Sequence, residues 1–318
     1  MSLITREKAG IVCSLSRLCA VAVAIQAILN PKSLSAQGYT ETWLVSDIPG
    51  IAAFTDTNLV NAWGMAVLPN DMLIVNANEN AIAGAYLQDG TPTGVYIGLN
   101  DGPSGMLVNQ GGGFKISDGH KSQASTFIFV TESGTIQGWN ANINAASAVT
   151  EVDNFAFDAV YKGVAQIGDR IFAANFKVGV IDMYDGHWNW LGAFTDSRVD
   201  PGFAPFNVAA INGQLYVTFA KRLAPEFRDD ESGPGNGYVD VFNPDGHFVR
   251  RLISHGALNS PWGLAMAPND FGAFSKALLV GNFGDGVINA YDPQTGTWLG
   301  AIADGGGNTG AVRSRREG

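Results

Sequence analysis

The fold of this chain is decided by residues 261–292, PWGLAMAPNDFGAFSKALLVGNFGDGVINAYD. With the residues that follow, this stretch contains four short β-type runs, at 262–266, 277–280, 287–291 and 297–302. The last two are separated by the turn from Asp292 to Gly296. Short apolar runs bounded by Gly, Pro, Asn and Asp are typical of β-strands joined by tight turns. Four of them in succession predict one antiparallel four-stranded sheet.

Weaker copies of this unit recur along the chain. The first strands of five units align as NAWGMAV (61–67), PSGMLV (103–108), YKGVAQI (161–167), PFNVAAI (205–211) and PWGLAMA (261–267). Each has a small or polar residue at the position of Gly263, and the third strands end in an aromatic residue close to a turn. A single sheet of this kind cannot bury both of its faces, whereas radial stacking covers them. The repeats therefore favour a β-propeller over a generic β-sandwich.

Longer motifs carry a family resemblance that runs from about Trp43 to Leu299. They are FAPFNV (203–208), DDESGPGNGYVDVF (229–242), LNSPWGLAMAP (258–268) and LLVGNFGDGVINAYDPQTG (278–296). The chain resembles a family of uncharacterised secreted bacterial six-bladed β-propellers with NHL-like repeats. The resemblance implies an all-β propeller of six-bladed type. The sequence itself supplies five full four-stranded units and an incomplete closing blade, to which 43–46 would contribute one strand.

Both ends of the chain differ in character from the repeats. Residues 1–36 have a basic start, a 12-residue apolar core over 18–29 and small residues up to Ala36, which predicts a signal peptide. The propeller domain is then 37–302, and 303–318 is predicted to be a disordered tail, truncated or altered in reading frame. The alternative is a member of the family that closes with five blades. The apolar core is too short to cross a bilayer comfortably, and its removal by cleavage would leave no stable membrane span; the alternative is a permanent anchor. The mature protein is therefore expected to be secreted, periplasmic or on the cell surface.

Composition limits the functional classes. The formal net charge is −10 and only 15% of residues are charged, which argues against a nucleic-acid partner, since such a partner needs a basic face. Both cysteines lie in the predicted signal peptide, so thiol chemistry is excluded after cleavage. We find no nucleophile elbow, phosphate-binding loop or zinc-protease motif. The chain is therefore more readily explained as a non-enzymatic protein.

The loops that follow the second strands carry the first set of candidate site residues. In a propeller, equivalent loops from successive blades gather at one face near the central channel. Amide and carboxylate oxygens gathered there are suitable ligands for Ca²⁺, the one candidate cofactor. Metal-dependent lactonases of propeller fold use a comparable set of residues. The predicted metal ligands are Glu132, Asn175, Asn207 and Asn282, and further rim candidates are Asn76, Asn78 and Asp285. Since Asn and Asp also cap and turn the backbone, a purely structural role is the alternative.

A long acidic loop and a set of aromatic residues complete the candidates. Asp229 and Asp230 lie in RDDESGPGNG (228–237), where they would bind a cation or a partner, or simply be solvated. Aromatic residues recur near the start of the first strands, and they either stack on a sugar at the channel mouth or pack between blades. They are Trp63, Tyr161, Phe206 and Trp262.

These features predict a secreted β-propeller that acts as a binding or scaffold module for an extracellular ligand or surface partner, with carbohydrate as one candidate. The alternative from another class is a metal-dependent hydrolase or lactonase with a calcium-type site at the channel mouth. A third reading is a non-functional remnant that lacks its closing blade.

Overall fold

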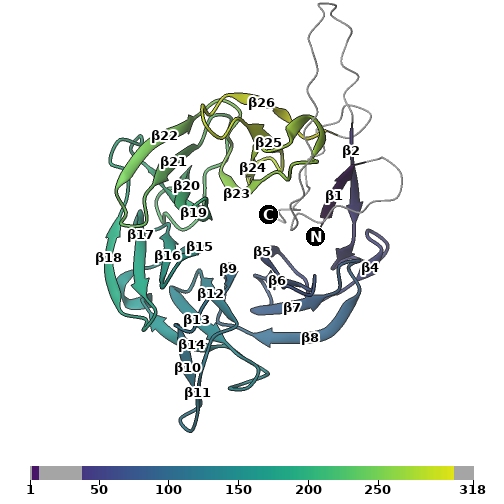
Figure 1. Ribbon diagram of the computed structural model, residues 1–318, viewed down its shortest axis with the longest axis vertical. Coiled ribbons are helices and arrows are strands. Elements are labelled where there is room, and N and C mark those ends of the chain that lie inside the picture. The colour runs from purple at the N-terminus through teal and green to yellow at the C-terminus, as the bar shows by residue number, and fades with distance from the viewer. Residues whose placement is uncertain (1, 7–37, 304–318) are drawn as a thin grey trace, which may run out of the picture.

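The computed structural model describes residues 2–6 and 38–303, and five four-stranded antiparallel sheets surround a central axis (Figure 1). In each sheet the strand nearest the axis comes first along the chain. In blade 2 a hairpin is inserted between the first and second strands. The strands of blade 1 are β5 (Ala62–Val67), β6 (Leu73–Ala77), β7 (Ile82–Tyr86) and β8 (Pro92–Gly98). Those of blade 2 are β9 (Pro103–Val108), β12 (Phe127–Thr131), β13 (Thr135–Trp139) and β14 (Val149–Asp153), with β10 (Lys115–Ser117) and β11 (Ser122–Ala124) as the inserted hairpin.

The other three blades follow the order of the repeats. Blade 3 consists of β15 (Tyr161–Ile167), β16 (Arg170–Asn175), β17 (Val180–Asp185) and β18 (Trp190–Phe194). Blade 4 consists of β19 (Phe203–Ile211), β20 (Gln214–Lys221), β21 (Tyr238–Phe242) and β22 (Phe248–Ser254). Blade 5 consists of β23 (Pro261–Met266), β24 (Leu278–Asn282), β25 (Ile288–Tyr291) and β26 (Trp298–Ala301). Two short 3₁₀ turns, η1 (Phe155–Phe157) and η2 (Gly272–Phe274), are the helical elements, and no helix of the described chain is long and apolar enough to cross a bilayer.

The glycines of the first strands allow neighbouring blades to approach closely at the axis. A Cβ atom on Gly64 would lie 2.3 Å from the carbonyl oxygen of Ser104 in blade 2. A Cβ on Gly105 would lie 2.6 Å from the Cα of Gly163 in blade 3. Both distances are far below van der Waals contact, so the recurrent glycine is a requirement of inter-blade packing. Gly263 in blade 5 differs, since its Cβ would approach only Gly281 of the same blade, at 3.4 Å.

The sector between blades 5 and 1 holds no four-stranded blade. It contains a two-stranded antiparallel sheet of β1 (Ser2–Arg6) and β2 (Tyr39–Trp43), and the parallel pair β3 (Val45–Ser46) and β4 (Phe54–Thr55) (Figure 1). The prediction of five four-stranded units is confirmed, but the six-bladed type is not, because the described residues form five blades.

A closing segment, residues 39–59, covers part of each face that a sixth blade would cover. Tyr39 packs on blade 5, where its hydroxyl donates to the carbonyl oxygen of Phe271 at 2.9 Å. Leu44 and Leu59 are buried in the core of blade 1. Val67 and Leu279, which lie on the two end faces of the ring, are therefore not left in the open. Leu279 is only 6% exposed, and Val67 is partly buried against the blade 1 core.

The predicted signal peptide and tail lie mostly outside the described residues. Residues 7–37 and 304–318 belong to that part of the chain. Within the predicted signal peptide, the backbone of Ser2–Arg6 pairs with β2, so that Ser2 faces Trp43 and Arg6 faces Tyr39. Cleavage near Ala36 would remove this partner strand.

Candidate functional site

Five side chains form a ring at one end of the central channel, because they hold equivalent positions in the five first strands. Each immediately precedes the glycine position of its blade. They are Trp63, Ser104, Lys162, Phe206 and Trp262. Tyr161, which the sequence placed among the recurring aromatics, belongs one position earlier. Its hydroxyl lies within the blade, 3.1 Å from that of Tyr184, and burial raises its pKa well above the ordinary value of a tyrosine.

Trp63 crosses the channel axis and touches three other blades. Its ring centroid lies 6.4 Å from that of Phe206 in blade 4 and 5.7 Å from that of Trp262 in blade 5, both in edge-to-face arrangements. It also lies 4.8 Å from the ring of Phe283. From blade 3, the ammonium of Lys162 stands 5.1 Å from the Trp63 ring, within the range of a cation–π contact. Trp63 therefore plugs this end of the channel.

Lys162 is the charged centre of the ring. It is 1% exposed, and its ammonium forms an ion pair with Glu132 and a second with Asp229 at 3.3 Å. The other carboxylate oxygen of Glu132 accepts a hydrogen bond from Asn78 Nδ2 at 3.1 Å. The carbonyl oxygen of Lys162 accepts from the indole Nε1 of Trp262 at 3.0 Å. These contacts satisfy the buried charge and join blades 1, 2, 3 and 5, together with the long loop of blade 4.

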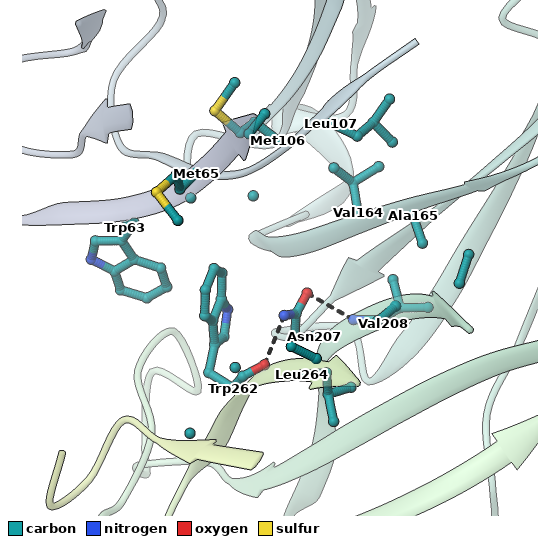
Figure 2. Close-up of a pocket in the computed structure, with 18 of the residues that line it drawn as sticks. Trp63, Met65, Met106, Leu107, Val164, Ala165, Asn207, Val208, Trp262 and Leu264 are labelled. Atoms are coloured by element: carbon teal, nitrogen blue, oxygen red, sulfur yellow. Dashed lines mark hydrogen bonds between the residues drawn. The ribbon is translucent and has the colours of Figure 1, made fainter. Parts of the chain in front are cut away.

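Beneath this ring lies a cavity of about 640 Å³ (Figure 2). All five first strands contribute to its wall, through Ala66, Met106, Val164, Val208 and Leu264. Met65 also faces it and is 46% exposed. At the opposite end from Trp63, the lining residues Gln110 and Ala210 are exposed, so the cavity opens to solvent at the end where the first strands finish.

The cavity extends sideways at one place, between blades 5 and 1. Blade 5 contributes residues of its second and third strands, Leu279, Gly281 and Ile288, in addition to its first strand. The other blades contribute first-strand residues and, in blade 2, Gln110 just after the strand. This extension, hereafter the side arm, lies where a sixth blade would pack on blade 5.

The predicted metal ligands Asn175 and Asn282 occupy equivalent positions and make equivalent bonds. Asn175 Oδ1 accepts from the backbone nitrogen of Val160 at 3.2 Å, and Asn282 Oδ1 accepts from that of Asn259 at 3.1 Å. In both blades the amide ties the end of the second strand to the segment that leads into the first. This is the capping role that was the structural alternative for these residues.

The other predicted site residues are also engaged in hydrogen bonds or backbone pairing within the protein. Asn207 donates to the carbonyl oxygen of Trp262 at 2.7 Å and accepts from the backbone nitrogen of Val208 at 2.8 Å (Figure 2). Asn76 donates to the carbonyl oxygen of Ser104 at 3.0 Å. Asp285 accepts from Asn259 Nδ2 at 3.1 Å, and Asp230 lies in a backbone bridge with Arg222.

This arrangement does not fit a calcium ion. Glu132 and Asp229, which belonged to separate candidate sites, lie on either side of one positive charge, and that charge is the Lys162 ammonium. Calcium needs six to eight oxygen ligands, and the amides of Asn175 and Asn282 are already engaged in their own blades. Within residues 38–303, no group of three or more His, Cys, Asp or Glu side chains is placed to hold a metal.

Sequence reasoning missed Lys162 and the side arm. Lys162 carried a usable signal: it is a charged residue in an apolar inner strand, at the position held elsewhere by Trp63, Phe206 and Trp262. The side arm had none, because it depends on how Met65 and the small residues of blade 5 face each other across the missing sector.

The fold and this site define a five-bladed β-propeller with a plugged channel and an apolar central cavity. No protein-family model matches the chain. It is 32% identical to uncharacterized protein R648 of Acanthamoeba polyphaga mimivirus over 288 residues, which cover 85% of this chain and 72% of that protein. It is 31% identical to uncharacterized protein L690 of the same virus, over 87% of this chain and 78% of that protein. The chain belongs to the family of these mimivirus proteins. The expectation of a bacterial family is thereby corrected.

Other similarities are partial or concern the fold alone. A third mimivirus relative, uncharacterized protein R640, is 37% identical over 234 residues, but the match spans only 44% of its length. Among solved structures, a chain of the nidogen–laminin complex has a TM-score of 0.51 at 12% identity, over 77% of this chain and 80% of that chain. The WD40 β-propeller domain of Doa1 also has a TM-score of 0.51, at 10% identity, over 83% of this chain and 72% of that one. At these identities the likeness shows that the fold is a β-propeller.

Proposed function

We propose that this protein is a secreted binding module that holds a ligand in its central cavity. The observation that carries the proposal is the cavity itself, about 640 Å³ in volume, with walls from all five blades. Ligand sites are typically concave, mostly apolar and within this range of volume.

The walls of the cavity are built to be stable without a ligand. The side chains of Val164 and Val208 are at most 7% exposed and belong to the cores between blades. The plugged end is held by the Trp63 contacts and by the bond from Trp262 to Lys162. A cavity with rigid walls binds with little ordering cost, which favours affinity.

Binding is tested with a substitution that fills the side arm. Ala265 lines the cavity, whereas Ala193 is an exposed residue of the outer strand β18 and does not. A panel of neutral, charged and oligosaccharide compounds is screened by thermal shift and by tryptophan fluorescence. We expect at least one class to bind, Ala265→Phe to abolish the response and Ala193→Phe to retain it. A panel without any binder, or binding unaffected by Ala265→Phe, would overturn the proposal.

The metal-dependent hydrolase or lactonase is the weaker candidate. Its support is the meeting of Glu132 and Asp229, and the structure places a lysine ammonium between them. Lys162 would have to leave before a cation could bind there. We therefore base the proposed function on the cavity rather than on the rim.

Export is the second part of the proposal. Its support is the basic start, apolar core and small residues of 1–36. Mass spectrometry of the protein recovered outside the cytoplasm should give a mature N-terminus close to Gln37. An intact Met1 on a membrane-bound form would show that the segment is retained as an anchor.

A further inference from the structure

The cavity wall carries no charge. Among its lining residues, all of which lie in the described part of the chain, none is Asp, Glu, Lys, Arg or His. The one charged side chain of the ring, Lys162, does not line the cavity and is already paired with Glu132 and Asp229. A charged ligand would lose its hydration there without gaining an ion pair.

Two of the three amide side chains of the wall are already bonded within the protein, and the third, Gln110, is exposed at the open end. Asn207 uses its nitrogen on Trp262 and its oxygen on Val208 (Figure 2). Gln166 accepts from the backbone nitrogen of Gln110 at 2.9 Å and donates to Asn109 Oδ1 at 3.0 Å. Neither amide needs a partner from a ligand. A polar ligand would therefore exchange its bonds to water for few bonds to the protein.

The side arm supplies the apolar surface. On the blade 5 side its wall is made of small and aliphatic residues, Gly263, Ala265, Gly281 and Leu279. A Cβ at Gly263 would meet only Gly281, so no side chain separates the backbone of Gly263 from the side arm. Met65 lines the same cavity from blade 1 and is 46% exposed. Methionine is unbranched and polarisable, and it adapts to apolar ligands of different shape.

We infer that the ligand is a neutral, apolar small molecule seated in the side arm between blades 5 and 1, in contact with Met65. This inference rests on the proposed function, since it names the chemistry of the ligand that the cavity holds. The missing sixth blade creates the site: a full blade packed on blade 5 would cover Leu279 and Ile288, which here line the cavity.

Two fluorescent probes with related ring systems separate charge from apolar character. N-phenyl-1-naphthylamine is neutral, and 1-anilinonaphthalene-8-sulfonate carries a sulfonate on the same skeleton. The full chain is titrated with each probe, and the dissociation constants are compared. We expect saturable binding of the neutral probe, with the sulfonate bound at least about tenfold more weakly, the factor that corresponds to about 1.4 kcal/mol.

Met65→Arg places a charge against the ligand, and Leu87→Arg is its matched control. Both native side chains are 46% exposed, but Leu87 does not line the cavity. We expect Met65→Arg to weaken binding of the neutral probe at least about tenfold and Leu87→Arg to change it less than about twofold. Should Met65→Arg fail to fold by circular dichroism, Met65→Gln tests the same contact without a charge and should weaken binding in the same direction.

The outcomes distinguish the inference from the proposed function. If both probes bind equally, and Ala265→Phe abolishes both, the cavity is a binding site but the ligand class is wrong. If binding of the neutral probe is unaffected by the Met65 variants and abolished by Ala265→Phe, the assigned contact is wrong. If neither probe nor any compound of the wider panel binds, the proposed function itself fails.

Discussion

At the scale of single residues, the first-strand glycines are not equivalent. Gly105 faces the backbone of blade 3, where an added Cβ would lie only 2.6 Å from the Cα of Gly163. Gly263 instead faces the side arm. We expect Gly105→Ala to lower the free energy of unfolding by about 1–3 kcal/mol, as overpacking does. Gly263→Ala should change it by less than about 1 kcal/mol, because a methyl group fits there and the unfolded chain loses freedom. Urea denaturation measures both.

Equal effects of the two substitutions would contradict this account. They would mean that the recurring glycine serves strand conformation, which the blades share, rather than the approach of one blade to the next. Neither position has a positive φ angle, so backbone strain does not enter the comparison.

Asp240 predicts a pH dependence of stability. It is fully buried on β21 and accepts a hydrogen bond from Arg251 Nε at 2.9 Å. Burial raises the pKa of Asp240 to about 6, with a further contribution from Asp196 and against the effect of Arg251. The unfolded value is near 3.8, so the folded state binds the proton more tightly. The contribution of Asp240 to the free energy of unfolding is therefore fully present below pH 3.8, and it is lost as the pH rises through about 6.

The measurement compares wild type with Asp240→Asn, which keeps the shape but cannot titrate. Between pH 4 and pH 7, the free energy of unfolding of the wild type should fall relative to the variant by on the order of 2 kcal/mol. A difference that rises with pH would show that Arg251 dominates and that the pKa of Asp240 is lowered.

At the scale of elements, the closing segment links the two ends of the ring. Tyr39 stacks on Phe271 with 4.8 Å between ring centroids, and its backbone nitrogen donates to the carbonyl oxygen of Ala303 at 3.0 Å. Five residues later, Leu44 enters the core of blade 1. The strand β2 and the residue that follows it therefore reach both end faces of the ring and cover part of each.

Tyr39→Ala should destabilise the protein by about 3 kcal/mol or more, as removal of a buried aromatic ring does. Tyr39 is 5% exposed, whereas Trp43 on the same strand is 39% exposed and serves as the control. Trp43→Ala should cost less than about 1 kcal/mol. Thermal unfolding of the two variants decides the matter. Comparable losses would show that the strand as a whole, rather than the Tyr39 contact with blade 5, closes the ring.

At the scale of the whole molecule, the positive charge beside Glu132 is the ammonium of Lys162, where the sequence predicted a metal ion. The Lys162 ammonium, Glu132 and Trp63 connect blades 1, 2 and 3 across the channel. We therefore expect the melting temperature of metal-free protein to be the same with and without added calcium. A bound ion would instead stabilise the fold by an amount that grows with its concentration. A calcium-dependent rise in melting temperature, lost in Glu132→Gln, would restore the metal site.

Much of the architecture was predictable from sequence because it depends on local patterns. Residues 261–292 contain the β-type runs and turns of a blade, and the aligned first strands at 61–67, 103–108, 161–167 and 205–211 all became inner strands. Period-two alternation and Asp-Gly turns act within a few residues of the chain. The number of blades was not predictable in the same way, because it depends on what covers the end faces.

The site shows the same division. The repeats predicted Glu132 at the channel mouth, since they place equivalent loops on one face, but they left open whether Trp63 and Trp262 line that mouth or pack between blades. The pairing of Lys162 with both Glu132 and Asp229, and the side arm that joins the channel, became visible only in the tertiary structure. This is because contacts across the axis join residues far apart in the chain: Trp63 and Trp262 are 199 positions apart, and nothing in the local sequence of either one records its partner.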